Sequence, residues 1–253
     1  MPIRKLRFIN ADLLKLIAAA LMLVDHIGYV FAPHLSADAW LTLRIIGRIS
    51  MPLFAFAIAE GCRYTRNKSL HFIMLFGLGV CCFLVYLIAL GQVYYNILIT
   101  FSFSVLNIYA LQFLKRSLLD KQSKVWQRLC APVLFIGVIA FTYVFCYFNA
   151  VDYGFWGCML PVFAALFDFH RIPAPALLRK TDCLPIRILT MAIGLLFLTL
   201  HNPFSIKIAA WAFCSIPILL LYSGKKGNWH LKYFFYIFYP AHLVILQGIF
   251  WLL

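Results

Sequence analysis

Long apolar runs, each about the length of a membrane-spanning helix, dominate the pattern of hydrophobic and polar positions. They cover approximately residues 13–31, 40–59, 72–90, 96–114, 129–148, 153–169, 187–200, 204–222 and 233–253. A bilayer core of about 30 Å is spanned by roughly 20 helical residues. Because the runs do not alternate with a period of two, they indicate helices rather than barrel strands. The pattern predicts an all-α, polytopic integral membrane bundle with about nine transmembrane helices.

The run at 187–200 is short and ends at His201-Asn202-Pro203, so the predicted number of helices ranges from eight to ten. The connections between the runs are too short to fold separately. The sequence therefore predicts one integral membrane domain over residues 1–253.

Composition excludes a soluble globular protein. Apolar residues make up 64% of the chain, charged residues 12%, and the mean hydropathy is +0.92. Soluble domains have about 45–50% apolar and about 25% charged residues.

The distribution of the basic residues along the chain explains the net charge of +14. All but four of the 22 Lys and Arg fall before the first run or in alternate connections after it: Arg4, Lys5, Arg7, Arg63, Arg66, Lys68, Lys115, Arg116, Lys121, Lys124, Arg128, Arg171, Arg179, Lys180, Arg187, Lys225, Lys226 and Lys232. The positive-inside rule then places the N-terminus in the cytoplasm. No nucleic-acid partner is needed to explain the charge.

A second set of ionisable residues lies inside or next to the apolar runs. It consists of Lys15, Asp25, His26, Arg44, Arg48, Glu60 and His242. An ionisable side chain in the membrane is costly without a partner and is a functional candidate by default.

Helical spacing brings several of these residues together. Lys15 and His26 are eleven positions apart, which returns almost to the same helix face roughly 16 Å along the axis. Arg44 and Arg48 share a face through their i,i+4 spacing, and His242 falls near the middle of the last run. Groups from three helices are therefore predicted to converge at one depth.

Neighbours on a helix point in different directions, so Asp25 is not expected to orient His26. We expect Asp25 to pair with Arg44 or Arg48 across a helix interface, leaving His26 free. The alternative is that the ion pair only holds two helices together and that His242 is a packing residue.

Acyl transfer is the chemistry that fits this set. A neutral His26 imidazole can take a proton from an acceptor as it attacks a thioester, and an arginine can stabilise the oxyanion. Lys15, Arg63 and Arg66 are candidates for holding the phosphates of coenzyme A. Alternatively, Arg63 and Arg66 are ordinary positive-inside residues.

Six blocks of sequence are distinctive: Leu14 to Gly28 (LKLIAAALMLVDHIG), Ile46 to Gly61 (IGRISMPLFAFAIAEG), Tyr64-Thr65-Arg66, Asn96-Ile97-Leu98 with Thr100, Tyr153-Gly154, and Phe235 to Leu243 (FYIFYPAHL). These blocks resemble the TraX family of membrane proteins. The resemblance extends from the first predicted helix to the last.

The resemblance implies an activity. The family is named for an enzyme that acetylates the N-terminal amine of a conjugative pilin in the bacterial inner membrane. It is similar to a wider superfamily of membrane acyltransferases that carry an Arg, ten residues and a catalytic His in the first helix. Here Lys15 occupies the Arg position and His26 the His position. The resemblance implies a cytoplasmic acetyl-CoA donor and an acceptor at the outer face.

The sequence therefore predicts a multi-pass inner-membrane acetyltransferase acting on a pilin-like protein, without a metal. The predicted catalytic group is His26, Asp25, Arg48 and His242. The predicted donor-binding group is Lys15, Arg44, Glu60, Arg63 and Arg66.

Three alternatives stay open at this point. The acceptor could be a hydroxyl of a cell-envelope glycan. A proton-coupled transporter could use Asp25, His26 and His242 as a relay. A structural assembly factor would tolerate substitution of the intramembrane charges.

Overall fold

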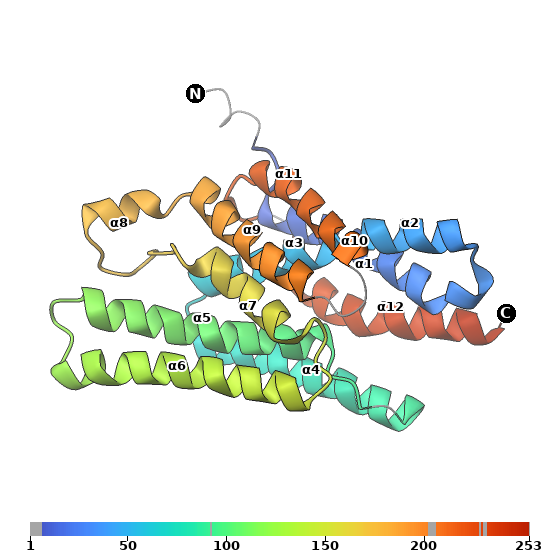
Figure 1. The fold of residues 1–253 in the computed structure, drawn as a ribbon, viewed down its shortest axis with the longest axis horizontal. Coiled ribbons are helices and arrows are strands. Elements are labelled where there is room, and N and C mark those ends of the chain that lie inside the picture. Colours follow the sequence, from blue (N-terminus) through green and yellow to red (C-terminus); the bar gives the residue numbers. More distant parts are fainter. Residues whose placement is uncertain (1–6, 92, 202–205, 228, 230–231, 253) are drawn as a thin grey trace. The chain divides into compact units, whose positions relative to one another are not determined.

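The computed structural model describes residues 7–91, 93–201, 206–227, 229 and 232–252, and within these the regular elements are helices (Figure 1). They are α1 (Ala11–Val30), η2 (Ala32–His34), α2 (Ala37–Gly47), α3 (Ser50–Tyr64), α4 (Lys68–Leu90), α5 (Ile97–Leu119), α6 (Val125–Phe148), α7 (Gly154–Ala165), α8 (Ala176–Thr181), α9 (Leu184–Leu200), α10 (Ile206–Ala209), η3 (Ala210–Cys214), α11 (Ser215–Leu220) and α12 (Lys232–Leu252). The all-α prediction is confirmed.

Among the described residues, six helical segments are long and apolar enough to cross a membrane: Ala11–Val30, Ala37–Tyr64, Lys68–Ile88, Ile97–Leu119, Val125–Phe148 and Phe234–Leu252. Three shorter apolar helices, Gly154–Ala165, Leu184–Leu200 and Ile206–Leu220, occupy most of the remaining predicted runs. The prediction of a polytopic helical membrane protein is confirmed. Arg4 and Lys5 of the predicted cytoplasmic N-terminus, and residues 204 and 205 of the eighth run, lie outside the described residues.

The chain forms two compact units. The first comprises Met1–Ala57 and Thr199–Leu253, and the second comprises Ile58–Leu198. Helix α3 runs from the first unit into the second. The single integral domain over 1–253 stays a prediction.

In the first unit, α1 packs on α2 and on α12. Small residues allow the α1–α2 approach, because a Cβ at Gly28 would press on Leu43. Ser50 adds a 2.7 Å hydrogen bond from its hydroxyl to the Ala18 carbonyl. Small residues and side-chain hydrogen bonds are the usual means of helix association in membranes.

The run predicted as one helix over 40–59 is interrupted. Helix α2 ends at Gly47 and α3 begins at Ser50, with Arg48 and Ile49 in the turn between them. Pro52 explains the interruption, because it has no N–H for the carbonyl of Arg48 and its ring would collide with that carbonyl in a continuous helix.

In the second unit, α5 lies at the centre and packs on α4, α6 and α7; Figure 1 shows α5 and α6 running side by side. Its buried polar residues bond to its neighbours. Thr100 donates to the Asp152 carbonyl at 2.7 Å, and Ser104 to the Cys158 carbonyl at 2.7 Å. Asn107 donates to the Thr142 hydroxyl at 2.8 Å. These bonds satisfy polar groups that lipid could not.

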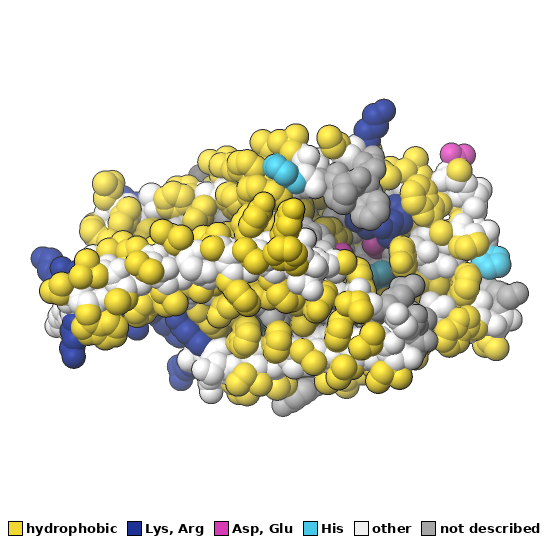
Figure 2. Space-filling model, turned by 60° about the horizontal axis from the view of Figure 1, so that its bottom comes forward, with side chains coloured by type: hydrophobic (Ala, Val, Ile, Leu, Met, Phe, Trp, Pro, Cys, Tyr) yellow, Lys and Arg dark blue, Asp and Glu magenta, His cyan; other side chains and the backbone are white. Residues whose placement is uncertain are grey.

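Helix α6 presents apolar side chains outward along its length. Val133, Ile136, Phe141 and Tyr147 are all more than half exposed. Hydrophobic side chains also predominate on the face in Figure 2. Such a surface suits contact with lipid chains rather than water.

Helix α9 begins at Leu184, three residues before the predicted run, and α8 was not predicted. Helix α8 carries Arg179 and Lys180 in a basic connection whose polarity hides a short helix from hydropathy analysis.

Candidate functional site

The acidic centre of the candidate site is Asp25, in the second half of α1. Its carboxylate accepts from Arg44 Nη1 at 2.8 Å and from Arg48 Nη2 at 2.6 and 2.7 Å. Arg44 also donates to the Asp25 carbonyl at 3.3 Å. The predicted ion pair between Asp25 and the arginines is confirmed, and both arginines take part in it.

Local structure explains why two arginines reach one carboxylate. The turn at Arg48 stays close to helical geometry, and its N–H donates to the Arg44 carbonyl at 3.2 Å. The i,i+4 spacing therefore survives the break between α2 and α3. With one carboxylate facing two guanidinium groups, the cluster carries an excess positive charge.

Gly47 is expected to be indispensable to this packing. A Cβ at this position would overlap the side chain of Asp25. We expect Gly47→Ala to lower the free energy of unfolding by about 1–3 kcal/mol, because the carboxylate and α2 must separate. Chemical unfolding in detergent measures the effect.

Gly248→Ala on α12 is the matched control, since a Cβ there meets nothing within 4 Å. Its stability should be unchanged or slightly higher, because alanine favours the helix. Equal losses for the two variants would contradict the close α1–α2 approach.

A histidine pair joins α1 to α12. His26 Nδ1 lies 2.7 Å from His242 Nε2, and the two rings stack with centroids 4.9 Å apart. His242 is only 4% exposed, and its Nδ1 lies 2.7 Å from the Phe238 carbonyl oxygen. Phe238 also stacks on the His242 ring. The structure thus brings together the two histidines that the sequence placed in different helices.

The Phe238 carbonyl determines how the protons are arranged. A carbonyl only accepts, so His242 Nδ1 must carry the hydrogen. In a neutral ring, His242 Nε2 then accepts from His26 Nδ1–H. This arrangement leaves the lone pair on His26 Nε2, the atom that can receive a proton.

Lys15 lies on the same helix and in the same unit as the histidine pair. Its Nζ lies 5.8 Å from the centroid of the Phe235 ring. It also interacts electrostatically with Asp12 and with Lys226. Its predicted role in donor binding stays a prediction.

Three of the other predicted donor-binding residues, Glu60, Arg63 and Arg66, belong to the second unit, and two of these are engaged in ion pairs. Glu60 accepts from Arg187 Nη1 at 2.5 Å, and both side chains are buried. Arg63 Nη1 donates to Asp168 at 2.8 Å and to Asp182 at 2.6 Å.

Arg66 is exposed in the turn between α3 and α4. The partners Asp168, Asp182 and Arg187 could not be predicted from the sequence, because each is far away along the chain. The one available signal was that Arg187 begins an apolar run, where an unpaired charge is costly. The cofactor roles of Arg44, Glu60, Arg63 and Arg66 stay predictions.

Within the described ranges, no three His, Cys, Asp or Glu side chains lie together as metal ligands would. The first unit therefore combines a histidine pair that can accept a proton with an ion cluster of excess positive charge, and the two arginines of that cluster interact electrostatically with His26.

Comparison with known proteins identifies the family. The family model described as TraX protein matches residues 10–250. A probable fimbrial assembly protein FimC, serogroup H1, from Dichelobacter nodosus is 30% identical over 94% of this chain and 94% of its own length. No solved structure matches the chain. The chain belongs to the TraX family.

Proposed function

We propose that this protein is a membrane acetyltransferase that moves an acetyl group from acetyl-CoA to the N-terminal amine of a pilin-like protein. The observation that carries the proposal is the hydrogen-bonded series Phe238 carbonyl, His242, His26. It holds His26 in the tautomer whose Nε2 accepts a proton, which is the property a general base needs.

The reaction balances through this one base. The lone pair of the neutral acceptor amine attacks the thioester carbonyl carbon, and a proton from the amine passes to His26 Nε2. The tetrahedral intermediate collapses with cleavage of the carbon–sulfur bond. The proton on His26 then passes to the coenzyme A thiolate, which leaves as the thiol, and the imidazole is neutral again. An N-terminal amine has a pKa of about 7.7–8.0, so a useful fraction is neutral near pH 7.

Asp25 and the two arginines support this chemistry in two ways. The ion pairs hold α1, and therefore His26, against α2. The excess positive charge of Arg44 and Arg48, which interact electrostatically with His26, also favours the developing oxyanion in a water-poor setting. His242 acts as a positioning residue through His26.

The comparisons support a pilin-like acceptor. The chain belongs to the TraX family, and the Dichelobacter nodosus relative is named as a probable fimbrial assembly protein. The proposal includes a bacterial inner-membrane location, with a cytoplasmic donor, an acceptor at the outer face and α1 entering from the cytoplasm.

The acceptor can be tested with purified protein, radiolabelled acetyl-CoA and a cell-envelope extract. We expect label on a small pilin-like protein, stable to mild alkali because an amide forms, and absent when N-terminal amines are blocked beforehand. Alkali-labile label on glycan would instead assign O-acetylation of an envelope polysaccharide. Absence of both transfer and coenzyme A binding would contradict the proposal and favour proton-coupled transport.

A further inference from the structure

A backbone-bonded pair of segments precedes α1. The Ile9 N–H donates to the Leu221 carbonyl at 3.1 Å, and the Ser223 N–H donates to the Ile9 carbonyl at 2.8 Å. The Ala11 N–H donates to the Lys225 carbonyl at 3.0 Å. These bonds hold residues 7–10, before α1, beside residues 221–225, after α11.

The segment beyond Lys225 is also held in place. Asp12, in the first turn of α1, accepts from the Trp229 N–H at 3.0 Å, and a Cβ at Gly227 would overlap its side chain. Gly224 has a φ of +72°, which favours glycine. Positive-inside topology needs only charge near the membrane and no fixed backbone. The backbone hydrogen bonds and the Asp12 contacts therefore fix these segments more closely than membrane topology requires.

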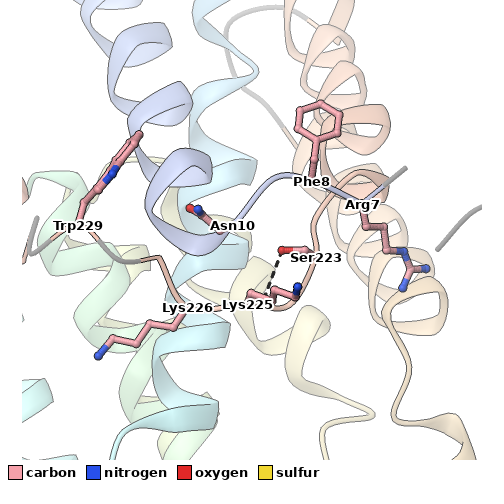
Figure 3. Close-up of a pocket in the computed structure, with 7 residues that line it drawn as sticks. All are labelled: Arg7, Phe8, Asn10, Ser223, Lys225, Lys226 and Trp229. Atoms are coloured by element: carbon pink, nitrogen blue, oxygen red, sulfur yellow. Dashed lines mark hydrogen bonds between the residues drawn. The ribbon is translucent and has the colours of Figure 1, made fainter. Parts of the chain in front are cut away.

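These segments line a half-open pocket of about 350 Å³, shown in Figure 3, within the usual range for ligand sites. Its lining residues are Arg7, Phe8, Asn10, Ser223, Lys225, Lys226 and Trp229, which we call the basic pocket. Three of them are cations and none is an acid. Arg7 Nε is buried and has no hydrogen-bond partner. A pocket with these properties favours an anion with several acceptor oxygens.

Aromatic side chains in the basic pocket indicate more than a simple anion. Trp229 is 55% exposed and Phe8 is 66% exposed. Figure 3 shows Trp229 and Arg7 at opposite ends of the pocket, with Lys225 and Lys226 between them. An exposed indole beside cations suits a nucleotide, because a base can stack on the ring while its phosphates meet the lysines.

The distance between the basic pocket and His26, the proposed base, favours coenzyme A over a lipid headgroup. Asn10 caps α1 and His26 lies sixteen residues further along this helix, which corresponds to about 24 Å. Lys15 lies between them on α1, and its positive charge and that of Lys226 repel each other, which favours an anion near both. Coenzyme A has its phosphates and its thioester at opposite ends of a long arm, whereas a lipid headgroup has no reactive group at that distance.

We propose that the basic pocket binds the phosphate groups and adenine of the acyl donor, and that its thioester end extends along α1 toward His26. This inference rests on the proposed function. It assigns the contacts with the donor phosphates to Arg7, Lys225 and Lys226 instead of Arg63 and Arg66. An anionic lipid headgroup offers the same phosphate chemistry, so the test separates the two sources.

The test measures equilibrium binding of coenzyme A and 3′-dephospho-coenzyme A to the purified protein in detergent. We expect wild type to prefer coenzyme A and its affinity to fall with salt. Lys225→Gln with Lys226→Gln should lower the affinity by about tenfold per lysine and remove the preference. Lys121→Gln with Lys180→Gln removes the same charge at exposed positions and should bind as wild type does.

The outcomes separate this inference from the proposed function. Unchanged coenzyme A binding in the Lys225/Lys226 variant would overturn the inference, and transfer by that variant at the wild-type rate would leave the proposed function standing. If that variant instead loses phosphatidylglycerol binding in nanodiscs and keeps coenzyme A binding, the pocket is a lipid site. A wild-type protein that binds no coenzyme A would overturn both proposals.

Discussion

Replacing His26 with glutamine is expected to reduce acetyl transfer by about 10²–10⁴-fold, the usual contribution of a general base. Glutamine preserves much of the side-chain volume and can still donate to His242 Nε2, but its amide cannot accept a proton from the attacking amine. The loss should fall on turnover and not on donor affinity. Single-turnover transfer from labelled acetyl-CoA measures the chemical step, and coenzyme A titration measures binding.

His242 provides the companion test of that expectation. His242→Gln retains an oxygen that can accept from His26 Nδ1–H, whereas His242→Leu removes the acceptor. Glutamine should therefore keep more activity than leucine, although both variants lose the bond to the Phe238 carbonyl. Wild-type transfer by His26→Gln, or equal transfer by both His242 variants, would contradict the proposed proton arrangement.

The site elements that the sequence predicted are those determined by local spacing and by the cost of charge in lipid. Asp25 and His26 are adjacent, so their side chains diverge, and the carboxylate had to find a partner on another helix. Arg44 and Arg48 were the available pair at i,i+4, and both contact it. His242 was recognised because an ionisable residue in the last apolar run needs a partner.

The features that were missed depend on contacts between distant parts of the chain. Arg63 pairs with Asp168 and Asp182 more than 100 residues away, and no spacing rule connects them. Its donor-binding role was inferred from charge alone. Lys225 and Lys226 were assigned only to topology, because hydropathy does not show that the backbone at Ser223 bonds to the segment before α1.

The break between α2 and α3 was not predicted, for a different reason. The continuous hydropathy of the run over 40–59 predicts one helix, although Pro52 leaves the Arg48 carbonyl without its helical hydrogen bond. Proline acts one turn before itself, so the irregular residues are Arg48 and Ile49. The turn therefore lies beside the Asp25 cluster, where the Arg48 guanidinium group contacts the Asp25 carboxylate.

Removing the charge of Asp25 is expected to be among the most destabilising single changes in the chain. Asp25→Asn keeps the shape but leaves Arg44 and Arg48 facing each other without their shared counter-ion, and both side chains are at most 20% exposed. Breaking a buried ion pair from one side costs about 3–5 kcal/mol, because an uncompensated charge stays buried. Unfolding of the purified protein in mixed micelles measures the loss of free energy.

The double variant Asp25→Asn with Arg48→Gln determines whether that loss comes from the ion cluster. Removing one guanidinium group along with the carboxylate relieves part of the repulsion, so the double variant should be more stable than the sum of the single losses predicts. Exposed Arg66→Gln, added to Asp25→Asn as the control, should recover nothing. Strictly additive losses for Asp25 and Arg48 would show that the carboxylate does not depend on this arginine and would leave Arg44 as its partner.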